Sequence, residues 1–139
     1  MQTGTICIVD ADSDDREMIT DIIKELKIPN ELLFFTTGND LTTYLSAAEE
    51  SPFMVLSEVD LPDMDGFDLR RILLNSDDRR FLSVPFIFWS NMAAEIQIQK
   101  ANKLGVHGFF LKPNSYVEME QSFKALIKYW NISIMPKKR

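Results

Sequence analysis

The chain has 139 residues and a hydrophobic content of 45%, which suffices for one globular domain with its own core. Its formal net charge of −6 repels phosphate backbones and argues against nucleic-acid binding. No apolar run approaches the length of a membrane span, and the first residues lack the basic and apolar segments of a signal peptide. The single cysteine, Cys7, excludes a disulfide framework. We therefore expect a cytoplasmic protein that binds neither nucleic acid nor membrane.

Short apolar runs alternate with helical patterns along the chain. The spacing predicts strands at residues 5–9, 31–37, 53–57, 84–90 and 108–111, and helices at 13–27, 39–50, 67–75, 93–104 and 115–130. Three of the strands are continuously apolar, which is typical of strands covered on both faces of a parallel sheet. Right-handed crossovers between such strands indicate a doubly wound α/β fold.

Polar residues mark the helix starts, and no change of composition divides the chain. Ser13 is expected to cap the first helix, and Ser115 is expected to open the last one with a capping box. We predict a single domain over residues 1–139, with its core at about 4–130 and a C-terminal tail at 131–139.

Four predicted strands end at polar side chains of different chemistry. These are Asp10, Glu58, Ser90 and Lys112, in chain order. Because ligands of doubly wound sheets bind outside the carboxyl ends of the strands, we expect the four to converge on one edge. Such a set suits a transferable phosphoryl group: a carboxylate attacks phosphorus, oxygen ligands hold a divalent cation, and the hydroxyl and the ammonium bind the phosphoryl oxygens.

Four segments resemble the receiver domain of bacterial two-component response regulators. They are CIVDADSDD (7–15), LSEVDLPDMDGFDL (56–69), VPFIFWSN (84–91) and GFFLKP (108–113), and they appear in order. The resemblance implies a five-stranded parallel sheet of order 2-1-3-4-5 with five helices, as in CheY-like and flavodoxin-like folds. It also implies a single-domain response regulator of a phosphorelay.

The resemblance assigns roles to six residues. Glu58 matches the phosphoacceptor, Asp10 the first acid of the acidic pair, Asp10 and the backbone carbonyl of Asp60 the metal ligands, Ser90 and Lys112 the phosphoryl contacts, and Phe109 the aromatic whose rotamer reports the active state. Asp12 lies near Asp10 and is expected in the same acidic pocket, but on an extended strand it would point to the other face, so it is no simple substitute for the second acid.

Two residues depart from the family pattern. Glu58 replaces an aspartate, and Ala11 replaces a magnesium ligand. The extra methylene moves the carboxylate by roughly 1.5 Å, and misplacement by about 1 Å can cost about a hundredfold in rate. We hypothesise that Glu58 pairs with Lys112 or hydrogen-bonds Ser90, that Mg²⁺ binding is weakened or lost, and that the protein is a pseudo-receiver.

Two other functions stay open. An active receiver would accept phosphate at Glu58, or at another acid such as Asp60, with Mg²⁺-dependent autodephosphorylation as its only enzymatic activity. A haloacid-dehalogenase-like phosphatase is the remote alternative, because IVDADS (8–13) resembles its nucleophile motif. The expected partner is a sensor histidine kinase or a downstream effector, and the chain is expected to be a monomer or a homodimer formed through residues 93–130.

Overall fold

A computed structural model describes residues 4–134 and contains one five-stranded sheet. The strands are β1 (Ile6–Val9), β2 (Leu32–Phe35), β3 (Met54–Glu58), β4 (Phe86–Ser90) and β5 (Gly108–Leu111). Their order is β2-β1-β3-β4-β5, and every neighbouring pair is parallel. The predicted fold class and strand order are therefore confirmed.

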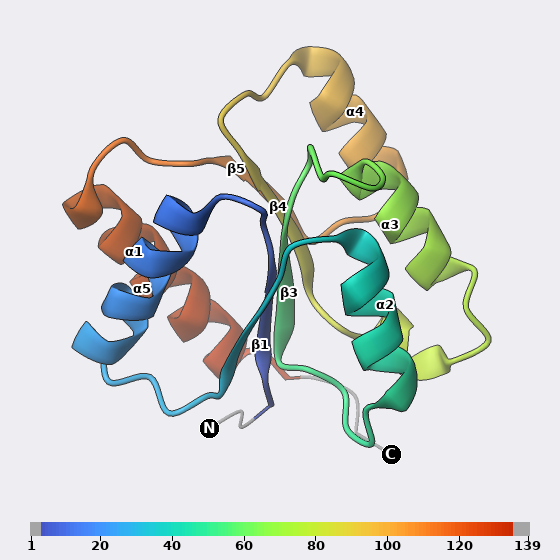
Figure 1. Cartoon of the computed structure of the whole chain (residues 1–139), viewed down its shortest axis with the longest axis horizontal. Helices are drawn as coiled ribbons and strands as arrows, with labels where there is room; N and C mark the ends of the chain where they lie inside the picture. Colours follow the sequence, from blue (N-terminus) through green and yellow to red (C-terminus); the bar gives the residue numbers. More distant parts are fainter. Residues whose placement is uncertain (1–3, 135–139) are drawn as a thin grey trace.

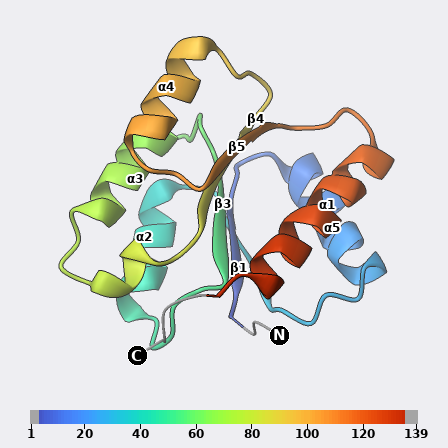
Figure 2. The same ribbon diagram turned by 180° about the vertical axis from the view of Figure 1, so that it is seen from behind.

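Helices cover both faces of the sheet. They are α1 (Ser13–Glu25), α2 (Gly38–Ala47), α3 (Gly66–Leu74), α4 (Glu95–Lys103) and α5 (Tyr116–Ile132). Figures 1 and 2 show α1 and α5 on one face and α2, α3 and α4 on the other. The last helix extends two residues into the predicted tail, and the end of that tail, 135–139, lies outside the described residues. Within 4–134, no helix is long and apolar enough to cross a membrane.

Two apolar clusters form the core, one on each side of the sheet. Side chains alternate between the two faces of a strand. Ile6 and Ile8 of β1 therefore belong to the cluster beneath α1 and α5, whereas Cys7 and Val9 belong to the cluster beneath the other three helices. All four are fully buried, so β1 is anchored in the core on both of its faces.

The start of α1 differs from the prediction by one residue. Asp12, not Ser13, is the N-cap, and its carboxylate accepts hydrogen bonds from the amides of Asp14 and Asp15 at 2.9 and 3.2 Å. Both residue types cap helices well, so local sequence does not decide between them. Ser115 is the N-cap of α5, and its hydroxyl accepts from the Glu118 amide at 3.2 Å, which is one of the two hydrogen bonds of the predicted capping box.

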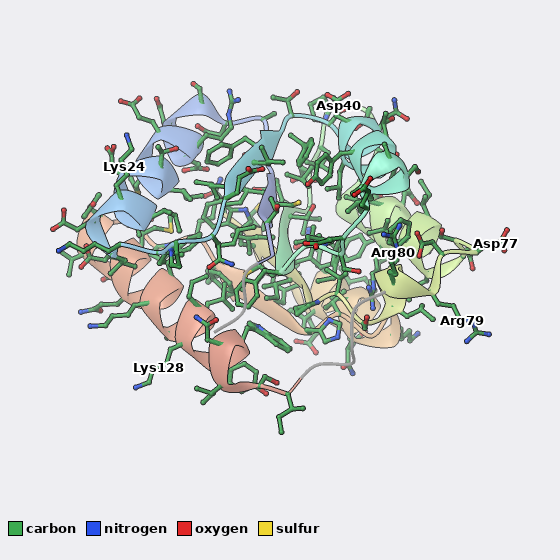
Figure 3. The ribbon with its side chains drawn as sticks, turned by 90° about the horizontal axis from the view of Figure 1, so that it is seen from below. Lys24, Asp40, Asp77, Arg79, Arg80 and Lys128 are labelled. Carbon is green, nitrogen blue, oxygen red and sulfur yellow. The ribbon has the colours of Figure 1, made fainter. Side chains whose placement is uncertain are left out.

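An unpredicted 3₁₀ helix, η1 (Arg79–Leu82), connects α3 to β4. The Arg80 guanidinium donates to the carbonyls of Ala48 and Glu49 at 3.0 and 2.7 Å, which ties η1 to the connection between α2 and β3. Figure 3 shows Arg80 turned towards the domain, whereas Asp77 and Arg79 point away from it.

Candidate functional site

Three of the predicted site residues meet at the carboxyl edge of the sheet, which lies at the top of Figure 1. Asp10 follows β1, Glu58 ends β3, and Lys112 follows β5. The Lys112 amide donates to the Ser90 carbonyl at 2.8 Å, so the β4–β5 ladder continues up to the lysine. Asp10 is 2% exposed and Glu58 is 8% exposed. The group is therefore largely withdrawn from water.

The Lys112 ammonium contacts three carboxylates. Its Nζ lies 2.9 Å from Asp10 Oδ2, 2.8 Å from Asp15 Oδ2 and 2.5 Å from Glu58 Oε2. We call Asp10, Asp15 and Glu58 the carboxylate cage. Burial acts to lower the pKa of Lys112, but the three carboxylates outweigh it and raise that pKa above its ordinary value. The ammonium is therefore firmly protonated, and the expected Glu58–Lys112 ion pair is present.

Both oxygens of the Glu58 carboxylate are engaged. While Oε2 faces the ammonium, Oε1 accepts from the amides of Val59 and Asp60 at 3.0 and 3.4 Å. The extra methylene of glutamate lets the side chain curl back onto the backbone that follows it. Ser90 Oγ accepts from the Met92 amide at 3.3 Å. Of the two partners predicted for Glu58, the ammonium is the one it meets.

Asp10 is the most buried carboxylate of the cage. Its Oδ1 accepts from the Asp12 amide at 2.9 Å, and its Oδ2 faces Lys112. Burial raises the pKa of Asp10, and this outweighs the amide of Asp12 and the ammonium, which act to lower it. One ammonium among three carboxylates leaves an excess of negative charge. The cage is thus short of positive charge even with Lys112 in place.

Asp15 occupies the pocket position that the sequence suggested for Asp12. Asp12 is exposed and caps α1, whereas the Asp15 side chain is 19% exposed and hydrogen-bonds Lys112. The signal for Asp15 was its spacing. It lies four and seven residues before Ile19 and Ile22, which are both fully buried, and so shares their face of the helix.

One aromatic ring contacts the site, and the predicted switch aromatic lies on the opposite face of the sheet. Lys112 Nζ lies 4.8 Å from the centre of the Trp89 ring, which is fully buried and stacks edge-on against Phe123. A cation over an indole face is held by the ring quadrupole. Phe109 is partly buried in the opposite cluster, with its ring centre 5.9 Å from that of Phe88.

The turn between β3 and α3 requires glycine at position 66. A Cβ there would lie 2.5 Å from Phe88 Cε1 and 2.8 Å from the Glu58 carbonyl oxygen. Asp65 caps α3 by accepting from the Asp68 amide at 2.8 Å. The close approach of Gly66 therefore fixes the backbone that carries Glu58.

Asp63 ties the same loop to the start of α2. Its two carboxylate oxygens accept from the amides of Gly38 and Asn39, both at 2.9 Å. An anion at a helix N-terminus also interacts favourably with the helix dipole. Slight desolvation acts to raise the pKa of Asp63, but the backbone amides of Asn39, Gly38, Asp63 itself and Met64 outweigh it and lower that pKa.

Asp63→Asn is expected to reduce the loss of stability in acid. The folded-state pKa of Asp63 is depressed, so its contribution is present above the ordinary carboxyl value of about 3.9 and is lost as pH falls through the folded value. Because Asp63 is exposed, we expect a difference below about 1 kcal/mol. Urea unfolding at a series of pH values measures it. Asp77→Asn is the matched control, and parallel profiles for Asp63→Asn and wild type would contradict the assignment.

A doubly wound sheet with acids, a hydroxyl and a lysine at its carboxyl edge defines a receiver-type protein. The sequence model of the response regulator receiver domain matches residues 6–124. The chain therefore belongs to the response regulator receiver domain family of two-component signalling. The matched family and strand order do not support the phosphatase alternative.

Solved structures of response regulators share the whole fold. The phosphorylated cyanobacterial phytochrome response regulator RcpA is 20% identical with a TM-score of 0.85, covering 98% of this chain and 100% of that one. The Mn²⁺-bound form of response regulator Rcp1 is 16% identical, with a TM-score of 0.83 and coverage of 96% and 99%. Chemotaxis response regulator CheY4 of Vibrio cholerae is 15% identical, with a TM-score of 0.74 and coverage of 90% and 99%. No curated protein sequence matches the chain.

Receiver domains bind a divalent cation, but the donors of this chain do not fit one as they are arranged. Ala11 offers no side-chain oxygen, and Asp10 and Glu58 face the Lys112 ammonium. The distances from Nζ to the cage oxygens, 2.5–2.9 Å, are those of an ammonium, whereas Mg²⁺ takes oxygens at about 2.0–2.1 Å. Within residues 4–134, no three His, Cys, Asp or Glu side chains are grouped to hold a metal ion.

Proposed function

We propose that this chain is a pseudo-receiver, a single receiver-like domain over residues 1–139 that acts in the cytoplasm by protein contact and does not accept a phosphoryl group at Glu58. The observation that carries the proposal is the ion pair of 2.5 Å between Glu58 Oε2 and Lys112 Nζ.

The proposal follows from what phosphoryl transfer needs. An acceptor carboxylate must present a free oxygen in line with the leaving group, and a cation must stabilise the charge on the phosphoryl oxygens. Here one Glu58 oxygen faces Lys112 and the other accepts two backbone amides. The nucleophile and the phosphoryl-binding lysine therefore satisfy each other. In a pseudo-receiver, Ser90 keeps the position of the phosphoryl-contacting hydroxyl and Phe109 keeps the position of the switch aromatic, but neither responds to phosphorylation of Glu58.

Output by protein contact requires a surface for a partner. The region 93–130 presents exposed apolar side chains, namely Ile96, Ile98, Leu111, Tyr116, Val117 and Tyr129. Exposed apolar side chains in this region support contact with a histidine kinase, a downstream effector or a second copy of the chain. The charge of −6 supports a protein partner over nucleic acid.

The decisive experiment is intact-protein mass after incubation with acetyl phosphate and Mg²⁺. The wild type should gain no phosphoryl group, because both Glu58 oxygens are engaged and Ala11 leaves the cation short of a ligand. The double variant Ala11→Asp/Glu58→Asp should gain one. We expect its rate to exceed that of the wild type by at least about a hundredfold. Glu58→Asp alone separates the effect of the acceptor from that of the metal ligand.

Two controls identify any acceptor that does react. A phosphoryl group on the wild type that Glu58→Ala abolishes would make Glu58 a working acceptor and overturn the proposal. If Glu58→Ala retains it and Asp60→Asn loses it, the active-receiver alternative holds with Asp60 as the acceptor. In either case autodephosphorylation is then measured as the decay of the phosphorylated mass.

A further inference from the structure

We propose that Lys112 is the resident cation of the carboxylate cage, and that Asp15 completes this cage so that the pocket excludes divalent cations. This inference deepens the proposed function and rests on it. The Lys112 ammonium takes the place in the pocket that an exchangeable divalent metal ion would otherwise occupy. It also gives Asp15 a role that the family pattern does not provide.

The first support is the convergence of three elements on one atom. Asp10 comes from the end of β1, Glu58 from the end of β3 and Asp15 from the first turn of α1, and each places an oxygen within 2.9 Å of Lys112 Nζ. The lysine side chain is only 5% exposed. An ammonium has three protons to donate, so three carboxylate oxygens match its donor capacity.

The second support is the position of Asp15 relative to Ala11. With alanine at position 11, the β1 end contributes only Asp10 to the cage. Asp15, one helical turn further along, supplies another carboxylate, and its Oδ2 accepts a hydrogen bond from Lys112 Nζ at 2.8 Å. Asp15 thus supplies the negative charge that Ala11 does not provide. Its carboxylate contacts the Lys112 ammonium and is not free to bind a metal ion.

The third support is the aromatic ring that the ammonium contacts. Lys112 Nζ lies 4.8 Å from the centre of the buried Trp89 ring. This contact is independent of the carboxylates and favours the same cation position. A metal ion would have to displace the ammonium from both the cage and the ring. A dication beside a retained ammonium would have to take oxygens that already contact that ammonium.

The test is a titration with Mn²⁺. Binding is measured by calorimetry and by the quenching of Trp89 fluorescence. Trp89 and Trp130 are the two tryptophans of the chain, so a Trp130→Phe background isolates Trp89 emission. The wild type should show no saturable binding at low millimolar Mn²⁺. Lys112→Met removes the internal cation, and it should bind Mn²⁺ at least about tenfold more tightly than the wild type.

A matched pair of variants tests Asp15 itself. Asp15→Asn in the Lys112→Met background should lose most of the gained Mn²⁺ affinity. Asp14→Asn in the same background should keep it, because Asp14 is the exposed neighbour on the same helical turn. Equal losses in the two variants would overturn the role of Asp15.

The wild-type titration decides the inference whether or not Lys112→Met folds. Saturable Mn²⁺ binding to the wild type that Asp10→Asn abolishes would overturn it. If that protein still gains no phosphoryl mass from acetyl phosphate, the pseudo-receiver function stands and only the resident cation is wrong. Phosphorylation at Glu58 would instead overturn the proposed function.

Discussion

Lys112→Met should lower the free energy of unfolding by about 3–5 kcal/mol, because it strands buried carboxylates without their cation. The methionine keeps most of the volume of the lysine stem, so the change isolates the loss of charge. Asp10 and Glu58 are 2% and 8% exposed, which leaves little water to compensate. Urea unfolding followed by circular dichroism measures the loss.

A second substitution shows whether charge is the cause. Glu58→Gln removes one negative charge from the carboxylate cage, so the double variant Lys112→Met/Glu58→Gln should recover part of the stability that Lys112→Met loses. Lys124→Met, at an exposed position of α5, is the control and should stay within about 0.5 kcal/mol of the wild type. A Lys112→Met protein as stable as this control would contradict the importance of the buried ammonium.

Gly66→Ala should destabilise the protein by about 1–3 kcal/mol, or more, because there is no room for a methyl group. The added Cβ would lie 2.5 Å from Phe88 Cε1 and 2.8 Å from the Glu58 carbonyl oxygen, and the second of these is backbone that cannot turn aside. Relief of the clash must move either the aromatic core or the strand end that carries Glu58. The substitution should therefore both displace Glu58 and lower the free energy of unfolding.

Gly108→Ala is the matched control for this prediction. Its Cβ would meet Ile87 at 3.6 Å, an ordinary van der Waals contact, so the variant should be close to wild type in urea unfolding. Equal stabilities of Gly66→Ala and Gly108→Ala would show that the loop carrying Glu58 relaxes freely. In that case the tight turn would not position the carboxylate.

The order of strands and helices follows from local patterns, so sequence was sufficient to predict it. Apolar runs and helical spacing depend only on neighbouring residues, and parallel strands place their carboxyl ends on one edge. For that reason Asp10, Glu58 and Lys112 were correctly expected to lie together. Opposite charges brought together in a buried place attract strongly, which made Lys112 one of the two partners predicted for Glu58, beside Ser90.

Only the tertiary structure shows that Asp15 is the third carboxylate of the cage. Asp12 and Asp15 lie in the same run of acids. Helical spacing places Asp15 on the face of Ile19, but it does not show that this face reaches Lys112. Successive residues of a helix differ by about 100° in direction. Once Asp12 takes the cap, Asp15 falls on the buried face with Ile19, close enough to reach Lys112 from the opposite end of the chain. Sequence therefore determined the fold and the meeting of Asp10, Glu58 and Lys112 at one edge of the sheet. The tertiary structure decided which of its two predicted partners Glu58 meets, and the packing of α1 on the sheet determined the cage that surrounds the ammonium.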